Sequence, residues 1–154
     1  MIDHKSNMKA VLESANNNIK LDESPFAAGI LCDDIFLICN NLSRSSGNPN
    51  MHAEIVCINR FCELYGADKL RDAILYSSCE PCLMCLHSIE NAGIPYIFFA
   101  ASIDDAIKYG SGDISNHTIE YVKKMGLHVS INGGLMRNEM CAIYEQCIRI
   151  RGEL

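Results

Sequence analysis

The chain lacks several features that would assign it to a membrane, disordered or nucleic-acid-coating class. No apolar run approaches the ~20 residues that a membrane-spanning helix needs. Apolar residues make up 49% of the 154 residues and charged residues 21%, a balance that excludes a disordered or low-complexity chain. Positive charge is in deficit, with 13 Lys and Arg against 19 Asp and Glu and a formal net charge of -6, so sequence-independent binding to a phosphate backbone is disfavoured. We therefore expect one soluble domain over residues 1–154.

Cysteine, in contrast, is abundant. Nine cysteines is a high count for this length, but the number is odd, and the first residues, MIDHKSNMKA, show no basic segment followed by an apolar stretch and a cleavage site. These features predict a cytoplasmic, reducing location. There, cysteines are mostly small buried apolar side chains, except where a metal or a reaction uses the thiolate.

Apolar periodicity divides the chain into alternating helices and strands. Helical spacing predicts helices over residues 3–20, 51–65, 81–91, 115–125 and 135–150. Short apolar runs predict strands over residues 26–32, 35–39, 73–76, 94–100 and 127–131, the first two forming an antiparallel hairpin at Asp33 and Asp34. Residues 40–50, rich in Asn, Ser, Gly and Pro, are expected to form a loop. This alternation predicts an α/β fold with a largely parallel sheet between helices.

Two short motifs lie at predicted helix starts. One is His52-Ala53-Glu54, and the other is Pro81-Cys82-Leu83-Met84-Cys85. Cys82 and Cys85, three residues apart, share a helix face, and Pro81 suits the first helical position. The positive end of the helix dipole lowers thiol pKa values toward the thiolate that binds metals.

One imidazole and two thiolates suit a single Zn²⁺ ion in a catalytic site. His52, Cys82 and Cys85 would occupy three tetrahedral positions and leave the fourth for water. Glu54 would then be free to take a proton from that water and to deliver protons to a ring nitrogen and a leaving amine. The expected reaction is hydrolytic deamination.

An H-x-E sequence followed by P-C-x-x-C is the signature of zinc-dependent nucleobase deaminases. The chain resembles the cytidine and deoxycytidylate deaminase superfamily through Asn41, residues 48–54, residues 75–85 and the apolar strand that ends at Ala100. Within it, the sequence is similar to bacterial guanine deaminases and to tRNA-specific adenosine deaminases. The resemblance implies a three-layer fold with a five-stranded mixed sheet between helices, and a homodimer.

The resemblance also implies three substrate contacts. Asn41 is expected to hydrogen-bond the base, Ala53 to offer its backbone amide to a base carbonyl, and Asp113 to accept protons from the guanine amine and ring nitrogen. Two of these residues also have an ordinary structural interpretation: Asn41 as a turn residue, and Asp113 as the cap of the helix near Ser115. A purine base or nucleoside, guanine first, is the favoured substrate. Deamination of adenosine to inosine in tRNA and deamination of cytosine or cytidine are the alternatives.

Residues near the two motifs are expected to have structural roles, and other classes of function would require different sequence features. Cys79 is expected to pack rather than ligate, His87 to face solvent or hydrogen-bond on its helix, and Glu80 to orient the turn before Pro81. The mixed charges of the last helix favour a solvated face over an RNA-binding strip. A structural zinc module would need a fourth ligand, an inactive interaction protein would normally lack Glu54, and a thiol oxidoreductase would keep its cysteine pair free of metal.

Overall fold

Five strands form one sheet in the computed structural model, which describes residues 1–112 and 117–154. Their order across the sheet is β2-β1-β3-β4-β5. The strands are β1 (Ala27–Cys32), β2 (Ile35–Asn40), β3 (Ile74–Cys79), β4 (Tyr96–Ala101) and β5 (Ser130–Asn132). The predicted hairpin is confirmed, since Cys32 pairs with Ile35 across the turn.

The sheet is mixed and contains two antiparallel and two parallel pairings. β1 runs antiparallel to both β2 and β3, whereas β3, β4 and β5 are mutually parallel. β2, β3, β4 and β5 therefore point the same way and only β1 opposes them, so the largely parallel sheet with one antiparallel hairpin is confirmed, as is the five-stranded mixed sheet. The crossover from β2 places β3 on the far side of β1, and periodicity does not show which side of the hairpin the next strand joins.

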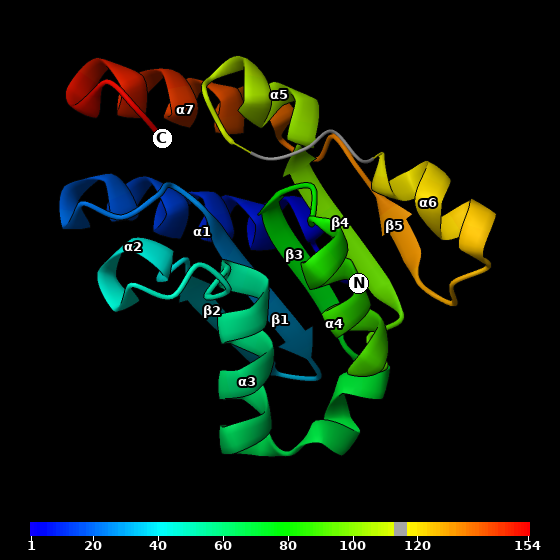
Figure 1. Ribbon diagram of the computed structural model, residues 1–154. Helices are drawn as coiled ribbons and strands as arrows, with labels where there is room; N and C mark the ends of the chain where they lie inside the picture. The colour runs from blue at the N-terminus through cyan, green and yellow to red at the C-terminus, as the bar shows by residue number, and fades with distance from the viewer. Residues whose placement is uncertain (113–116) are drawn as a thin grey trace.

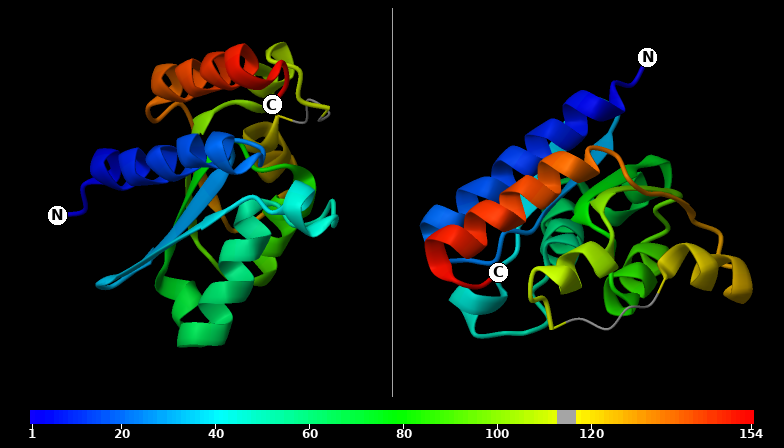
Figure 2. Two further views of the ribbon diagram at one scale, coloured as in Figure 1. Left: turned by 90° about the vertical axis from the view of Figure 1, so that its left-hand side faces the viewer. Right: turned by 90° about the horizontal axis from the view of Figure 1, so that it is seen from above.

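Helices cover both faces of the sheet (Figures 1 and 2). α1 (His4–Asn18) and α7 (Arg137–Arg151) lie side by side on one face, with α5 (Ile103–Lys108) packed against α7. The other face carries α3 (Ala53–Tyr65), α4 (Leu83–Asn91) and α6 (Thr118–Met125). The three-layer arrangement implied by the resemblance is thus present. Shorter elements are α2 (Ser43–Ser46) and the 3₁₀ turns η1 (Ile19–Leu21) and η2 (Ala67–Asp72).

Two apolar cores separate the three layers. The first lies between the sheet and α3, α4 and α6, and includes Ile30, Phe61 and Leu75. The second lies between the sheet and α1, α5 and α7. At Gly29 of β1, a Cβ atom would approach the Phe36 ring to 2.7 Å and Val11 to 3.0 Å, so glycine lets α1 pack closely on the sheet.

Two helices depart from the sequence prediction. α2 lies inside residues 40–50, which were expected to be a loop, and α5 was not predicted at all. α5 begins with a capping box, because Ser102 accepts from the Asp105 backbone N–H and Asp105 accepts from the Ser102 backbone N–H. Among the described helices, none is both long and apolar enough to pass through a bilayer.

Candidate metal and catalytic centre

The starts of α3 and α4 meet beside the carboxyl end of β3 (Figure 1). His52 is the N-cap residue of α3, and Cys82 is the N-cap residue of α4. Pro81 therefore precedes the helix, which corrects the prediction that it occupies the first helical position. Cys85 lies in the first turn of α4 and is completely buried. Two helix ends thus place one imidazole and two sulfurs at a common point.

The geometry of these three side chains fits a zinc ion. Nδ1 of His52 lies 3.6 Å from Sγ of Cys82 and 3.6 Å from Sγ of Cys85. A tetrahedral ion with Zn–S of about 2.3 Å and Zn–N of about 2.0–2.1 Å separates nitrogen from sulfur by roughly the same distance, about 3.6 Å. All three ligand atoms lie within 4.8 Å of one another. The predicted set His52, Cys82 and Cys85 is therefore brought together as a candidate zinc site.

The two thiols have opposite pKa shifts. The pKa of Cys82 is lowered to about 4, because its sulfur accepts a hydrogen bond from Cys85 and, despite partial burial, is also stabilised as thiolate by His52. Donation to Cys82, together with burial, raises the pKa of Cys85. One thiolate is therefore stabilised by the protein alone. A divalent cation would supply the charge that the second thiolate needs.

Glu54 lies in the first turn of α3, next to the cluster but outside the candidate ligand set. Its side chain is buried, and burial raises the pKa of its carboxyl group. Oε1 accepts a 3.0 Å hydrogen bond from the Ser77 hydroxyl, and Oε2 lies 3.5 Å from the Cys85 sulfur. A buried carboxyl group with a raised pKa, held beside a candidate metal site, is suited to general acid–base chemistry.

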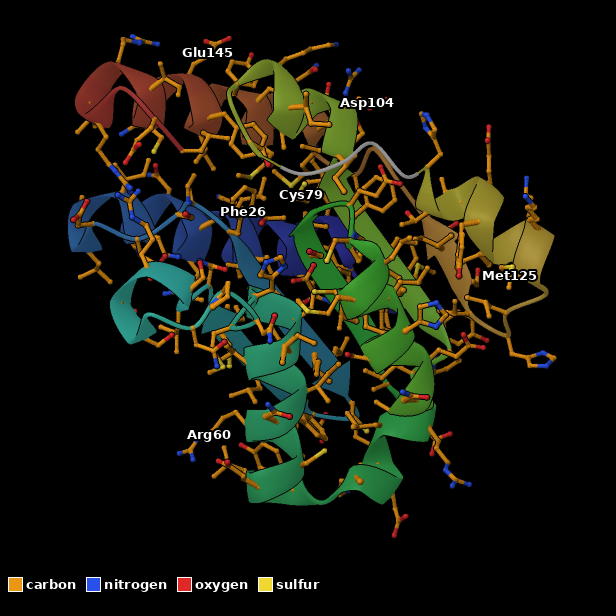
Figure 3. All side chains as sticks on the ribbon, in the orientation of Figure 1. Phe26, Arg60, Cys79, Asp104, Met125 and Glu145 are labelled. Atoms are coloured by element: carbon orange, nitrogen blue, oxygen red, sulfur yellow. The ribbon has the colours of Figure 1, made fainter. Side chains whose placement is uncertain are left out.

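A cavity of about 170 Å³ opens onto this cluster. Its polar wall includes Asn41, Ser43, Glu54 and Ser77, and its lining is completed by Ser24, Phe26, His52, Ala53, Ser78, Cys79, Glu80 and Cys82. Phe26 and Cys79, both labelled in Figure 3, form an apolar part of the wall. Tyr144 of α7 supports it, with its ring centroid 5.8 Å from that of Phe26.

The residues that line this cavity all lie in a part of the chain that matches a known protein family. Residues 1–101 match the family described as the cytidine and deoxycytidylate deaminase zinc-binding region. The chain belongs to this deaminase family. The match includes both helix-start motifs, so the candidate zinc site of His52, Cys82 and Cys85 lies within the zinc-binding region of the family.

Individual deaminases resemble this chain in sequence and in structure. Over 91 residues the chain is 42% identical to guanine deaminase of Bacillus subtilis, an alignment that covers 58% of each chain. It is 29% identical over 143 residues to a tRNA-specific adenosine deaminase of Streptococcus pyogenes, covering 92% of this chain and 87% of that protein. The structure of guanine deaminase from Nitrosomonas europaea superposes with a TM-score of 0.83 at 23% identity, covering 96% of this chain and 85% of that one, which shows the shared fold.

The expected substrate-contacting residues of the deaminase family have different outcomes. Asn41 and Ala53 both line the cavity, and Ala53 is the first residue of α3, where a backbone N–H has no partner within the helix. Their contact with substrate stays a prediction. Asp113 lies outside the described residues.

The neighbouring residues behave as expected. Glu80 orients the turn before Pro81, because its carboxylate accepts from the backbone N–H groups of Ile103 and Thr118 and so ties this turn to the starts of α5 and α6. Cys79 is buried in the second core, outside the candidate ligand set. His87 is exposed and lies 3.1 Å from the Tyr121 hydroxyl.

The remaining cysteines only partly follow the expectation of a core position. None of the nine cysteines, all of which lie in the part of the chain that the structure describes, forms a disulfide. Of the six outside the motif region, half are fully buried and half are half-buried; the buried ones are Cys32, Cys57 and Cys147, and the half-buried ones are Cys39, Cys62 and Cys141.

Two polar residues of the site were not predicted. Ser77 contacts Glu54 from β3, and Glu23 hydrogen-bonds Asn41 from the segment before β1. A serine inside an apolar strand and a glutamate before Pro25 carry no local signal of their own. The role of a buried polar residue such as Ser77 can be recognised only once the pairing of the strands is known.

Proposed function

We propose that this chain is a zinc-dependent hydrolytic deaminase that releases ammonia from a purine base, with conversion of guanine to xanthine as its main reaction. The observation that carries the proposal is one small cavity that is lined by two of the candidate zinc ligands, His52 and Cys82, and by the buried Glu54. The third ligand, Cys85, lies in direct contact with Glu54.

The chemistry assigned to the site is an exchange of an amino group for a carbonyl oxygen. A zinc ion held by His52, Cys82 and Cys85 would supply Lewis-acid activation of a water molecule. Glu54 would move the first proton of that water to the ring nitrogen beside the reacting carbon, and would then move the second proton, from the hydroxyl added to this carbon, to the amino group. The C–N bond breaks, ammonia leaves, and the carbonyl forms. Ser77 holds one carboxylate oxygen of Glu54 in place during these transfers.

The size of the cavity favours a free base. About 170 Å³ is less than the roughly 300–1,000 Å³ typical of sites for drug-sized ligands, and it suits one planar ring system better than a nucleotide. The net charge of -6 also disfavours a polyanionic substrate. The chain is also 42% identical over 91 residues to a guanine deaminase, and this similarity supports guanine as the base.

Deamination of adenosine in tRNA is the second candidate, supported by one specific observation. The tRNA-specific adenosine deaminase of Streptococcus pyogenes aligns with 92% of this chain, including regions that the Bacillus guanine deaminase alignment does not reach. This reading predicts a reaction confined to structured RNA and binding that weakens steeply as salt rises.

The test is ammonia release by the zinc-loaded protein from guanine, adenine, cytosine, their nucleosides and a tRNA anticodon stem-loop. We expect xanthine and ammonia in equal amounts from guanine, at a rate insensitive to salt. Ammonia from the stem-loop alone would replace the guanine assignment with the tRNA reaction, and ammonia from cytosine or cytidine alone would move the substrate to a pyrimidine.

A homodimer and a cytoplasmic location are further parts of the proposal. The family resemblance supports the dimer, and the odd number of free thiols supports a reducing compartment. Sedimentation equilibrium of the zinc-loaded protein tests the dimer, and a monomer at micromolar concentration would contradict it.

A further inference from the structure

Glu23 places a buried carboxylate behind the wall of the cavity. It is 3% exposed. Oε1 accepts from the backbone N–H of Ser24 at 2.9 Å, the side-chain amide of Asn41 at 2.9 Å and the backbone N–H of Arg44 at 3.3 Å. Oε2 accepts from the backbone N–H of Ser45 at 2.9 Å. Burial alone would raise the pKa of Glu23, but these donors outweigh it and lower the pKa, so the carboxylate is ionised near neutral pH.

Two of these bonds cap α2 from a distance. Arg44 and Ser45 are the second and third residues of α2, and the N-cap residue Leu42 has no side chain able to accept their N–H groups. Glu23 supplies the missing acceptor. The short helix and the cavity wall are therefore fixed by the same carboxylate.

The remaining bond determines which end of the Asn41 amide faces the cavity. A carboxylate only accepts hydrogen bonds, so the group that faces Glu23 must be the NH₂ of Asn41. Its other N–H is directed to Oγ of Ser43 at 2.8 Å. Both N–H groups of Asn41 are thus used inside the protein, and what this side chain can offer a ligand is its oxygen, Oδ1.

Ser43 then has the opposite polarity. Its Oγ accepts from Asn41, which leaves the hydroxyl hydrogen to donate, and both residues line the cavity. Within the described residues, neither Oδ1 of Asn41 nor the hydroxyl hydrogen of Ser43 has a hydrogen-bond partner. The wall therefore presents an acceptor beside a donor.

We infer that Glu23 is a positioning residue for specificity: it fixes the Asn41 oxygen as an acceptor in the cavity wall, and this acceptor selects a free purine base over its nucleoside. A free purine carries an N–H at position 9, the donor that this oxygen needs. A nucleoside has lost the position 9 donor to its sugar. A site built to bond an N–H rejects a ligand that lacks it, because Oδ1 is then left unpaired. This inference rests on the proposed function.

Base analogues test the inference through substrate preference. 9-Methylguanine and 9-deazaguanine both lack the N9–H, one with added bulk and one without. For the zinc-loaded wild-type protein, kcat/KM for guanine should exceed that for each analogue by about 5- to 150-fold, the range for one unmet buried hydrogen bond. Equal values for all three bases would overturn the inference without any variant.

Two variants separate the roles of the wall residues. Glu23→Gln allows the Asn41 amide group to rotate by 180°, because a glutamine amide can also donate. The kcat/KM of this variant for guanine should fall, and the ratio of its kcat/KM for guanine to that for each position 9 analogue should shrink toward one. Ser43→Ala removes the acceptor of the second Asn41 N–H but leaves Glu23 in place, so it should keep the preference over both position 9 analogues. Glu13→Gln, the same change at an exposed position on α1, is the matched control and should keep all ratios. A wild-type set of ratios in Glu23→Gln would contradict the inference.

Nuclear magnetic resonance tests Glu23 independently of turnover. The Asn41 NH₂ signals of the zinc-loaded protein are assigned by their loss in Asn41→Asp. Their exchange with water should be slow in the wild type and in Glu13→Gln, and about 5-fold or more faster in Glu23→Gln, the ratio for one hydrogen bond of roughly 1 kcal/mol. Unchanged exchange would overturn the role of Glu23. Slow wild-type exchange without any guanine turnover would reject the proposed function and leave this role standing.

Discussion

The hydroxyl of Ser77 donates a 3.0 Å hydrogen bond to Oε1 of Glu54, from the end of β3 to the first turn of α3. The other carboxylate oxygen of Glu54 lies 3.5 Å from the sulfur of Cys85. The carboxylate is thus held between the sheet and the candidate metal site. Both groups are buried, so water competes poorly for either contact.

Ser77→Ala should slow turnover without releasing zinc. The substitution leaves Oε1 of Glu54 without its donor, and a hydrogen bond to a charged group contributes about 1.5–3 kcal/mol, so a loss of roughly 10- to 150-fold in kcat is expected. Ser88→Ala removes a hydroxyl that bonds only to the Met84 carbonyl oxygen on α4 and serves as the control. Equal kcat for the two variants would show that Ser77 does not position Glu54.

Zinc should bind at one ion per chain and depend on both cysteines of α4. Cys82→Ala and Cys85→Ala each remove one of three protein ligands, so metal analysis after dialysis should show strong loss of zinc. Cys62→Ala, at a half-buried cysteine on α3, should keep the full complement. Full zinc content in both α4 variants would reject the ligand assignment.

The sequence was sufficient to predict the candidate zinc site because each of its three residues is marked by a local pattern. His52 and Cys82 occupy helix starts, and residue spacing alone brings Cys85 to the same face of α4 as Cys82. Ser77 and Glu23 could not be found in this way. Their roles depend on the pairing of β3 with β1 and on the approach of residue 23 to α2, contacts made across 23 and about 20 positions of sequence.

The secondary structure was likewise predictable where the signal is local and less so where it depends on distant residues. Long periodic segments such as α1 and α7 were predicted, with bounds that differ from the structure by a few residues. α2 was missed because its cap is the distant Glu23 and not a residue of its own segment. α5 was missed although Ser102 and Asp105 form a local capping box, a signal that was available in the sequence.

The pair Asp105 and Arg137 should make stability depend on pH. Two hydrogen bonds of 2.6 Å from the Arg137 guanidinium lower the pKa of the Asp105 carboxyl below its usual value. A carboxyl group with a lowered folded pKa stabilises the fold above its unfolded pKa of about 3.9, and this contribution is lost as pH falls from there toward the folded pKa.

Arg137→Met should therefore lower the melting temperature at pH 7, and the difference from wild type should narrow as pH falls below about 4. Arg149→Met, at an exposed arginine of α7, is the control. Thermal unfolding monitored by circular dichroism measures both. A difference between Arg137→Met and wild type that stays constant down to low pH would show that this ion pair is not the source.

Asp113→Asn tests the predicted recognition of the guanine amine. The carboxylate is expected to accept hydrogen bonds from the guanine amine and ring nitrogen, a contact that adenine, with its different edge, would not satisfy, so the variant should lose more kcat/KM for guanine than for adenine. One mispaired contact corresponds to about 1–3 kcal/mol, or roughly 5- to 150-fold in selectivity. An equal loss for both substrates would indicate a structural role, such as capping, for Asp113.

The most direct test of the account is guanine turnover and zinc content measured together in Glu54→Ala. The carboxyl group is assigned to proton transfer and not to metal binding, so the variant should keep its fold and one zinc per chain while kcat falls by about 10²- to 10⁴-fold or more. Glu63→Ala, at an exposed glutamate of the same helix, should match the wild type in both measurements. Near-normal xanthine formation by zinc-loaded Glu54→Ala would contradict the assignment of Glu54 as the proton carrier of a hydrolytic deaminase.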